Sequence, residues 1–169
     1  MAIIRVAANA KSKAGPENVY ALLKDGSTWP HWAMFDRFEL ERPGRDEPFG
    51  VGAIRVFITK VSRAREEIVE LVPERRLSYV LLSGLPLRGY RADVDIAPEA
   101  SGGAVIDWRA SFEPKHFGTG WFWRLFMARV LATTARQLAS AAEDPNMLAL
   151  LPANSPTARS AAAREGAAV

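Results

Sequence analysis

The sequence predicts an α+β fold in which a curved antiparallel sheet of about seven strands wraps around one long C-terminal helix. From residue 2 to 112 the chain reads as short segments, many of them alternating between apolar and polar residues and separated by turn residues, as strands do. From about 120 to 143 the apolar period becomes helical. Because one helix against a curved sheet leaves space between the two layers, we expect function to reside in a cavity.

The N-terminal region predicts one strand followed by two short helices. Residues 2–9 are the strand candidate. The Gly-Pro-Glu segment at 15–17 starts a helix, because proline and an acidic residue are both favoured in a first helical turn, and the Asp-Gly pair at 25–26 ends it. Ser27 is expected to cap a second helical turn that carries Trp-Pro-His-Trp at 29–32.

The following strands form an antiparallel meander. They are expected at 35–42, 53–60, 62–72, 77–82, 90–96 and 105–112. The last two alternate most clearly, and their inward faces consist of Tyr90, Ala92, Val94, Ile96, Ile106, Trp108, Ala110 and Phe112. Asp93 and Asp95 then face outward, where Arg91 or Arg109 would pair with them.

The long helix has one sheet-facing stripe, formed by Trp123, Met127, Val130, Leu131, Thr134, Leu138 and Ala141. Its opposite side carries Arg129, Arg136, Gln137 and Ser140. The first turns are apolar nearly all round, so a loop, a ligand, a membrane surface or a second copy in a homodimer must cover them. Burial under the loop at 85–87 is the favoured interpretation. We assign 1–144 to one domain and 145–169 to an Ala/Pro-rich, disordered tail.

Composition excludes several classes of function. The chain of 169 residues has no cysteine and two histidines, so we expect no disulfide, no metal site, no cofactor and a reducing, cytoplasmic environment. Its 22 basic residues are dispersed, which argues against nucleic acid as a partner. No stretch approaches the roughly 20 apolar residues that a transmembrane helix requires.

Several short motifs resemble those of a known superfamily. They are Pro-Glu-Asn-Val-Tyr at 16–20, Trp-Pro-His-Trp at 29–32, Gly-Val-Gly-Ala at 50–53 and the segment 66–79, followed by the long helix. Over residues 2–143 the chain resembles the START-like (SRPBCC) helix-grip superfamily, and within it the bacterial polyketide cyclase/dehydrase and lipid-transport branch. The resemblance implies a helix-grip fold. Members bind lipids or polyketides, and some cyclise polyketides or recruit protein partners.

The candidate ligand-binding residues are mostly aromatic: Trp32, Phe35, Phe57, Tyr79, Tyr90, Trp108, Phe122 and Phe126, with Val130. They are expected to line the pocket between sheet and helix, and the hydroxyls of Tyr79 and Tyr90 could orient the polar end of a ligand. The alternative is that the same rings fill a solid core.

The candidate catalytic residues are Arg55, Glu66 and His31. An inward Arg55 could hold a carboxylate or stabilise an enolate, but its apolar neighbours offer an equally good inner face, and the outward placement is favoured. Glu66 or Glu70 could place a carboxyl group inside, and His31 or His116 could act as a general base.

These observations predict a protein that binds a small hydrophobic or amphipathic molecule, such as a lipid or polyketide, between the sheet and the C-terminal helix. One alternative is a polyketide cyclase or dehydratase that uses the same cavity and needs an inward ionisable group. The other is a co-chaperone-like interaction module, which predicts a solid core and an exposed apolar patch.

Overall fold

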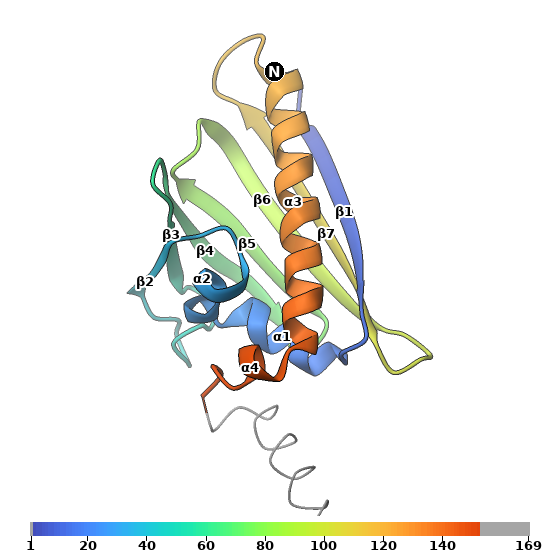
Figure 1. The fold of residues 1–169 in the computed structure, drawn as a ribbon. Coiled ribbons are helices and arrows are strands. Elements are labelled where there is room, and N and C mark those ends of the chain that lie inside the picture. The colour runs from blue at the N-terminus through green and yellow to red at the C-terminus, as the bar shows by residue number, and fades with distance from the viewer. Residues whose placement is uncertain (1, 153–169) are drawn as a thin grey trace, which may run out of the picture.

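The computed structural model describes residues 2–152 and confirms the α+β fold with a long C-terminal helix. Seven antiparallel strands form one sheet in the order β1-β7-β6-β5-β4-β3-β2 (Figure 1). They are β1 (Ile4–Ser12), β2 (Arg37–Arg42), β3 (Ile54–Ile58), β4 (Arg63–Val72), β5 (Arg76–Ser83), β6 (Leu87–Pro98) and β7 (Ala104–Pro114). The meander predicted from the turn residues is therefore the observed topology.

Four α-helices accompany the sheet: α1 (Pro16–Lys24), α2 (Trp29–Trp32), α3 (Gly120–Glu143) and α4 (Pro145–Leu148). The helix α3 crosses the concave face beside β1 and β7, while α1, α2 and α4 gather at the end of the sheet where α3 finishes (Figure 1). A membrane-spanning helix would have to be longer or more apolar than any found within residues 2–152.

The two short N-terminal helices are where the turn chemistry placed them. Pro16 begins α1, and a short 3-10 helix at Gly26–Thr28 leads into α2. The predicted cap at Ser27 is wrong, because Ser27 lies inside the 3-10 helix, where its backbone N–H donates a hydrogen bond to the carboxylate of the N-cap residue Asp25 at 3.0 Å. The residue at the N-cap position of α2 is Thr28, and its side chain makes no capping hydrogen bond, so the aspartate caps the 3-10 helix that leads into α2.

The strand β3 is buried on both faces. Its outer face presents Ile54, Val56 and Ile58, all buried and separate from the main core. Three ion pairs bridge β2 and β4 across this face: Arg63–Glu39 at 2.7 Å, Arg65–Glu41 at 2.6 Å and Arg42–Glu67 at 3.0 Å. Because the aliphatic stems of arginine can cover apolar surface, an apolar face can turn outward here, and Arg55 and Phe57 turn inward.

The alternation in β6 and β7 is confirmed. The eight residues predicted to face inward are all buried, from Tyr90 to Phe112. On the opposite face, Asp93 pairs with Arg91 at 2.9 Å and Asp95 pairs with Arg109. The inward faces of these two strands therefore form part of the hydrophobic core between the sheet and α3.

The helix α3 turns most of its predicted stripe toward the sheet. Met127, Leu131, Thr134, Leu138 and Ala141 are buried, whereas Trp123 and Val130 are half-buried at the side of the core.

The first turns of α3 are exposed, so the predicted burial under the loop at 85–87 is wrong. The carbonyl of Pro86 in that loop instead accepts a hydrogen bond from the backbone N–H of Lys115 at 2.9 Å. The loop thus extends the pairing of β6 with β7 and does not fold over the helix.

Past residue 144, the chain forms α4 and buries Leu151 against the core. The rest of the predicted tail, residues 153–169, lies outside the described residues.

Candidate functional site

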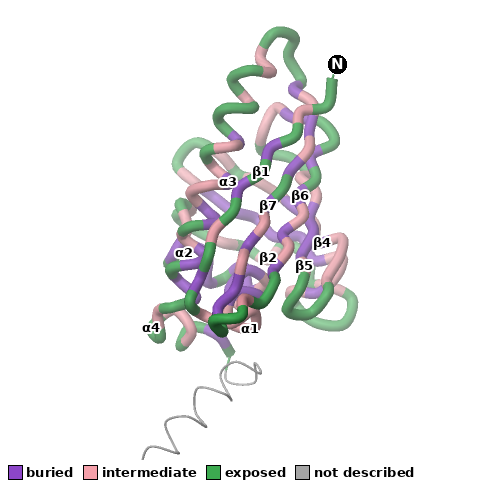
Figure 2. Tube along the Cα trace, turned by 90° about the vertical axis from the view of Figure 1, so that its right-hand side faces the viewer, coloured by how far each residue is buried: buried purple, intermediate pink, exposed green. Residues whose placement is uncertain are grey.

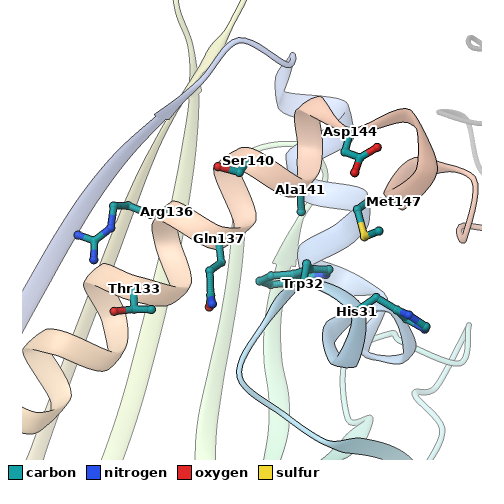
Figure 3. A pocket seen from close by; sticks show the side chains of 9 residues that line it. All are labelled: His31, Trp32, Thr133, Arg136, Gln137, Ser140, Ala141, Asp144 and Met147. Atoms are coloured by element: carbon teal, nitrogen blue, oxygen red, sulfur yellow. The ribbon is translucent and has the colours of Figure 1, made fainter.

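A pocket of about 380 Å³ lies between α2 and the C-terminal half of α3 (Figure 3). Its lining residues are His31 and Trp32 from α2, Thr133, Arg136, Gln137, Ser140 and Ala141 from α3, and Asp144 and Met147 beyond the end of α3. Ligand pockets in proteins range from about 300 to 1,000 Å³ and combine apolar surface with a few polar groups. This pocket has that size and that mixture.

Trp32 is held rigidly beside the pocket. Its indole N–H donates a hydrogen bond to the Thr28 hydroxyl at 3.0 Å, and that hydroxyl donates in turn to the backbone carbonyl of Asp25 at 2.8 Å. The centroid of its ring lies 4.8 Å from that of Trp29 in the core. A ring that is fixed in this way can pack against an apolar ligand without losing side-chain entropy on binding.

Gln137 supplies an unsatisfied acceptor on the opposite side of the pocket. Its Oε1 atom is buried and has no hydrogen-bond partner in residues 2–152, and the side chain extends from α3 toward the space beside Trp32 (Figure 3). A buried polar atom without a partner costs about 1–3 kcal/mol. A hydroxyl or N–H group that reaches this atom from the pocket would remove this cost.

Most of the predicted ligand-binding rings lie behind this pocket and pack against one another. The ring centroid of Trp29 is 4.6 Å from Phe57 and 6.0 Å from Trp108, and the indole N–H of Trp108 donates to the Tyr79 hydroxyl at 3.3 Å. Burial raises the pKa of the Tyr79 and Tyr90 hydroxyls, so both are neutral hydrogen-bonding groups at pH 7.

Arg55 is fully buried, so the interpretation that placed it outside is wrong. Its Nη1 donates to the carbonyls of Leu23 at 2.8 Å and Lys24 at 3.2 Å, and its Nη2 donates to the carboxylate of Glu66. The guanidinium carbon lies 5.2 Å from the ring centroid of Trp29, within cation–π range.

Glu66 is likewise inward and buried. It is one of the two glutamates that the sequence offered for an inward position. Burial raises the pKa of Glu66, and the adjacent Arg55 guanidinium acts in the opposite direction. Because Arg55 binds the last carbonyls of α1, where a cation also complements the helix dipole, this ion pair fastens α1 to the sheet.

The remaining candidates are dispersed. His31 is exposed at the rim of the pocket, and His116 is exposed in the loop before α3. Phe35 packs against Trp29 and Phe57, whereas Phe122 and Phe126 lie in the exposed first turns of α3. Within residues 2–152, His, Asp and Glu side chains form no group of three or more that could hold a metal ion.

Sequence reasoning missed the contribution of Gln137 and Ser140 to the pocket. The sequence placed both on the side of the long helix that faces away from the sheet, and in the structure this side of α3 lines the pocket. The missing information was the position of α2, which covers this side of α3 near its C-terminal end (Figure 3). A polar glutamine among alanines gives no signal of such a neighbour.

Comparison with known proteins identifies relatives of the whole domain. Residues 4–143 match the family model described as polyketide cyclase/dehydrase and lipid transport. No curated protein matches at a significant level.

Three of the similar solved structures show the breadth of the fold. A START superfamily protein from Mycobacterium smegmatis has 12% identity and a TM-score of 0.72, with 82% of this chain and 97% of that chain covered. The XoxI protein from Bacillus cereus has 17% identity and a TM-score of 0.64, covering 86% and 99%. Norcoclaurine synthase from Thalictrum flavum, in complex with dopamine and hydroxybenzaldehyde, has 14% identity and a TM-score of 0.65, covering 82% and 86%. These likenesses establish the START-like fold.

Proposed function

This chain belongs to the polyketide cyclase/dehydrase and lipid transport family, and from that premise we propose that it binds a small amphipathic molecule in the pocket between α2 and α3. The observation that carries the proposal is the buried, unpartnered Oε1 atom of Gln137 beside that pocket. A ligand with an apolar ring would pack against Trp32, and its hydroxyl or N–H group would donate to Gln137.

Trp32 separates the pocket from the aromatic core. Trp32 contacts Trp29, which in turn packs on Phe57 and Trp108, so movement of the α2 segment would let a larger ligand reach the predicted rings between sheet and helix. Norcoclaurine synthase shares the fold and binds dopamine and hydroxybenzaldehyde, which are aromatic molecules with polar substituents. Ligands of that chemical class suit the tryptophan and the unpaired amide oxygen of this pocket.

A second candidate is a cyclase-type enzyme, because Arg55 and Glu66 provide the inward ionisable groups that such chemistry needs. The hydrogen-bonding atoms of Arg55, apart from Nε, are engaged by Leu23, Lys24 and Glu66. A substrate would have to displace these partners to reach the guanidinium. The contacts therefore support ligand binding ahead of catalysis.

Fluorescence titration with anilinonaphthalene sulfonate, an aromatic amphiphile with an N–H donor, tests the proposal. Ser140→Trp should weaken binding at least about tenfold, because an indole at this exposed position fills the pocket. Gln137→Leu should weaken binding roughly three- to tenfold without lowering stability, because it removes an unsatisfied buried acceptor. Lys60→Trp adds the same ring at an exposed turn and should change nothing.

Native mass spectrometry of the protein purified from its source provides the second readout. We expect a stoichiometric small-molecule adduct that Ser140→Trp removes and Lys60→Trp retains. If probe affinity is the same in Ser140→Trp and Gln137→Leu as in the unmodified chain, and no adduct is found, the pocket is not the ligand site.

A further inference from the structure

The first turns of α3 and the loop before them carry large apolar side chains that residues 2–152 leave exposed. We call this surface the α3 tip and define it by five exposed residues: Phe117, Trp121, Phe122, Leu125 and Phe126. Phe117 is 93% exposed and Trp121 is 73% exposed. The tip projects past the end of the sheet as a mostly exposed loop and helix end (Figure 2). Within the helix, the ring centroid of Phe122 lies 6.2 Å from that of Trp121 and 5.9 Å from that of Phe126, and an exposed cluster of apolar rings of this kind marks an interaction site.

All the charged residues between Glu113 and Glu143 are basic. From residue 114 to 142 the sequence has no aspartate or glutamate, but it places Lys115, Arg124 and Arg129 within and beside the tip. All three are exposed, and none is within salt-bridge distance of an acidic group in the described part of the chain. The complementary surface is therefore anionic as well as apolar.

A hollow at the side of the tip combines both properties. It has a volume of about 460 Å³ and is lined by Ile4, Gly120, Trp121, Arg124, Leu125 and Ala128. Five of these residues offer apolar or backbone surface, and Arg124 offers a guanidinium that can bind a phosphate through two hydrogen bonds. Such a hollow fits the junction between a lipid headgroup and its acyl chain.

We propose that the α3 tip docks this protein onto an anionic phospholipid surface. Aromatic and leucine side chains would enter the boundary between headgroups and acyl chains, while Lys115, Arg124 and Arg129 would contact phosphates. A second copy of the chain is a poorer occupant, because a twofold contact through the tips would bring Arg124 and Arg129 of both copies together. The inference goes beyond the proposed function, since the ligand pocket lies along the C-terminal half of α3.

Co-sedimentation of the full chain with lipid vesicles tests the inference. We expect binding to vesicles of phosphatidylcholine mixed with phosphatidylglycerol, and much weaker binding to phosphatidylcholine alone. Each cation near an anionic membrane strengthens binding roughly fivefold, so Arg124→Ser/Arg129→Ser should weaken it about 25-fold. Trp121→Ser/Leu125→Ser should weaken it at least about tenfold, because the apolar anchors are lost. Added salt should weaken the binding of the unmodified chain.

Two exposed residues outside the tip provide matched controls. Val61→Ser removes an exposed apolar side chain and Arg75→Ser an exposed cation, and both variants should bind vesicles like the unmodified chain. Absence of binding to the anionic vesicles, or binding that the tip variants leave unchanged, would overturn the inference. So would a dimer in sedimentation velocity that Trp121→Ser/Leu125→Ser converts to monomers, because the tip would then be a self-association surface. Loss of the pocket ligand in Ser140→Trp would leave these outcomes unaffected.

Discussion

Replacement of Arg55 by methionine should strongly destabilise the fold. The substitution removes the guanidinium that binds the carbonyls of Leu23 and Lys24, and it leaves the Glu66 carboxylate buried without a cation. Methionine retains most of the side-chain volume and can pack against Trp29. The change therefore isolates the loss of charge and hydrogen bonding from the creation of a cavity.

The expected loss is about 3–5 kcal/mol in the free energy of unfolding, because that is the cost of leaving one member of a buried ion pair without its partner. For a domain of this size it corresponds to a decrease in Tm of roughly 6–20 °C. Arg63→Met provides a control, since its ion pair with Glu39 is half exposed on the outer face of the sheet. That variant should lose less than about 1 kcal/mol.

The penalty should also depend on pH. Burial already raises the pKa of Glu66 in the unmodified protein, and removal of Arg55 takes away the opposing influence, so the folded-state pKa rises further. A carboxyl group with a raised folded-state pKa contributes stability fully below its unfolded pKa, and this contribution is lost as the pH rises through the folded-state value. Arg55→Met should therefore be less destabilising at pH 5 than at pH 8.

Urea denaturation followed by tryptophan fluorescence measures these quantities at each pH. A double-mutant cycle with Glu66→Gln should show that Arg55→Met/Glu66→Gln loses less stability than the sum of the single variants, by at least about 1 kcal/mol. The pH dependence of the penalty should disappear in the double variant, because residue 66 no longer carries a titratable carboxyl group. A loss below about 1 kcal/mol, the same penalty at both pH values, or an additive cycle would refute the idea that this pair fastens α1 to the sheet.

Two further substitutions probe the elements that support the pocket. Asp25→Ala should lower the free energy of unfolding by about 1 kcal/mol, because it removes the N-cap of the 3-10 helix before α2. Asp25→Asn should retain most of that stability in the same urea titration. Equal losses in both variants would contradict the capping role. Tyr79→Phe should cost about 1–3 kcal/mol, because the buried indole N–H of Trp108 loses its acceptor; unchanged stability by calorimetry would mean that this 3.3 Å contact contributes nothing.

Local patterns in the sequence were sufficient to predict the fold. The alternation in β6 and β7 fixed which residues face the core, because Asp93 and Asp95 on the other face are paired in solvent. The change to a helical period at Gly120 marked the start of α3. Likewise, Pro16 marked the start of α1, since proline is favoured only in the first turn of a helix.

For the candidate aromatic residues, the sequence does not distinguish lining a ligand cavity from filling the core. Phe57, Tyr79, Tyr90 and Trp108 were expected to line a ligand cavity, and they form a tightly packed core. Composition cannot distinguish the two arrangements, because the same rings fill a core or surround a ligand according to the separation of the sheet and the helix. Their contact with a ligand therefore stays a prediction that the titrations above address.

The sequence by itself determined the order of elements, the meander and the inward faces of β6 and β7, since each depends on residues close together in the chain. Only the tertiary structure decided the side to which Arg55 points and the place of Gln137. In β3 the alternation of residues does not show which face points inward, because arginine stems from β2 and β4 bury the outer face as well. At Gln137 it fails because the pocket depends on α2, whose residues lie about a hundred positions earlier in the chain and meet α3 only when the sheet has folded.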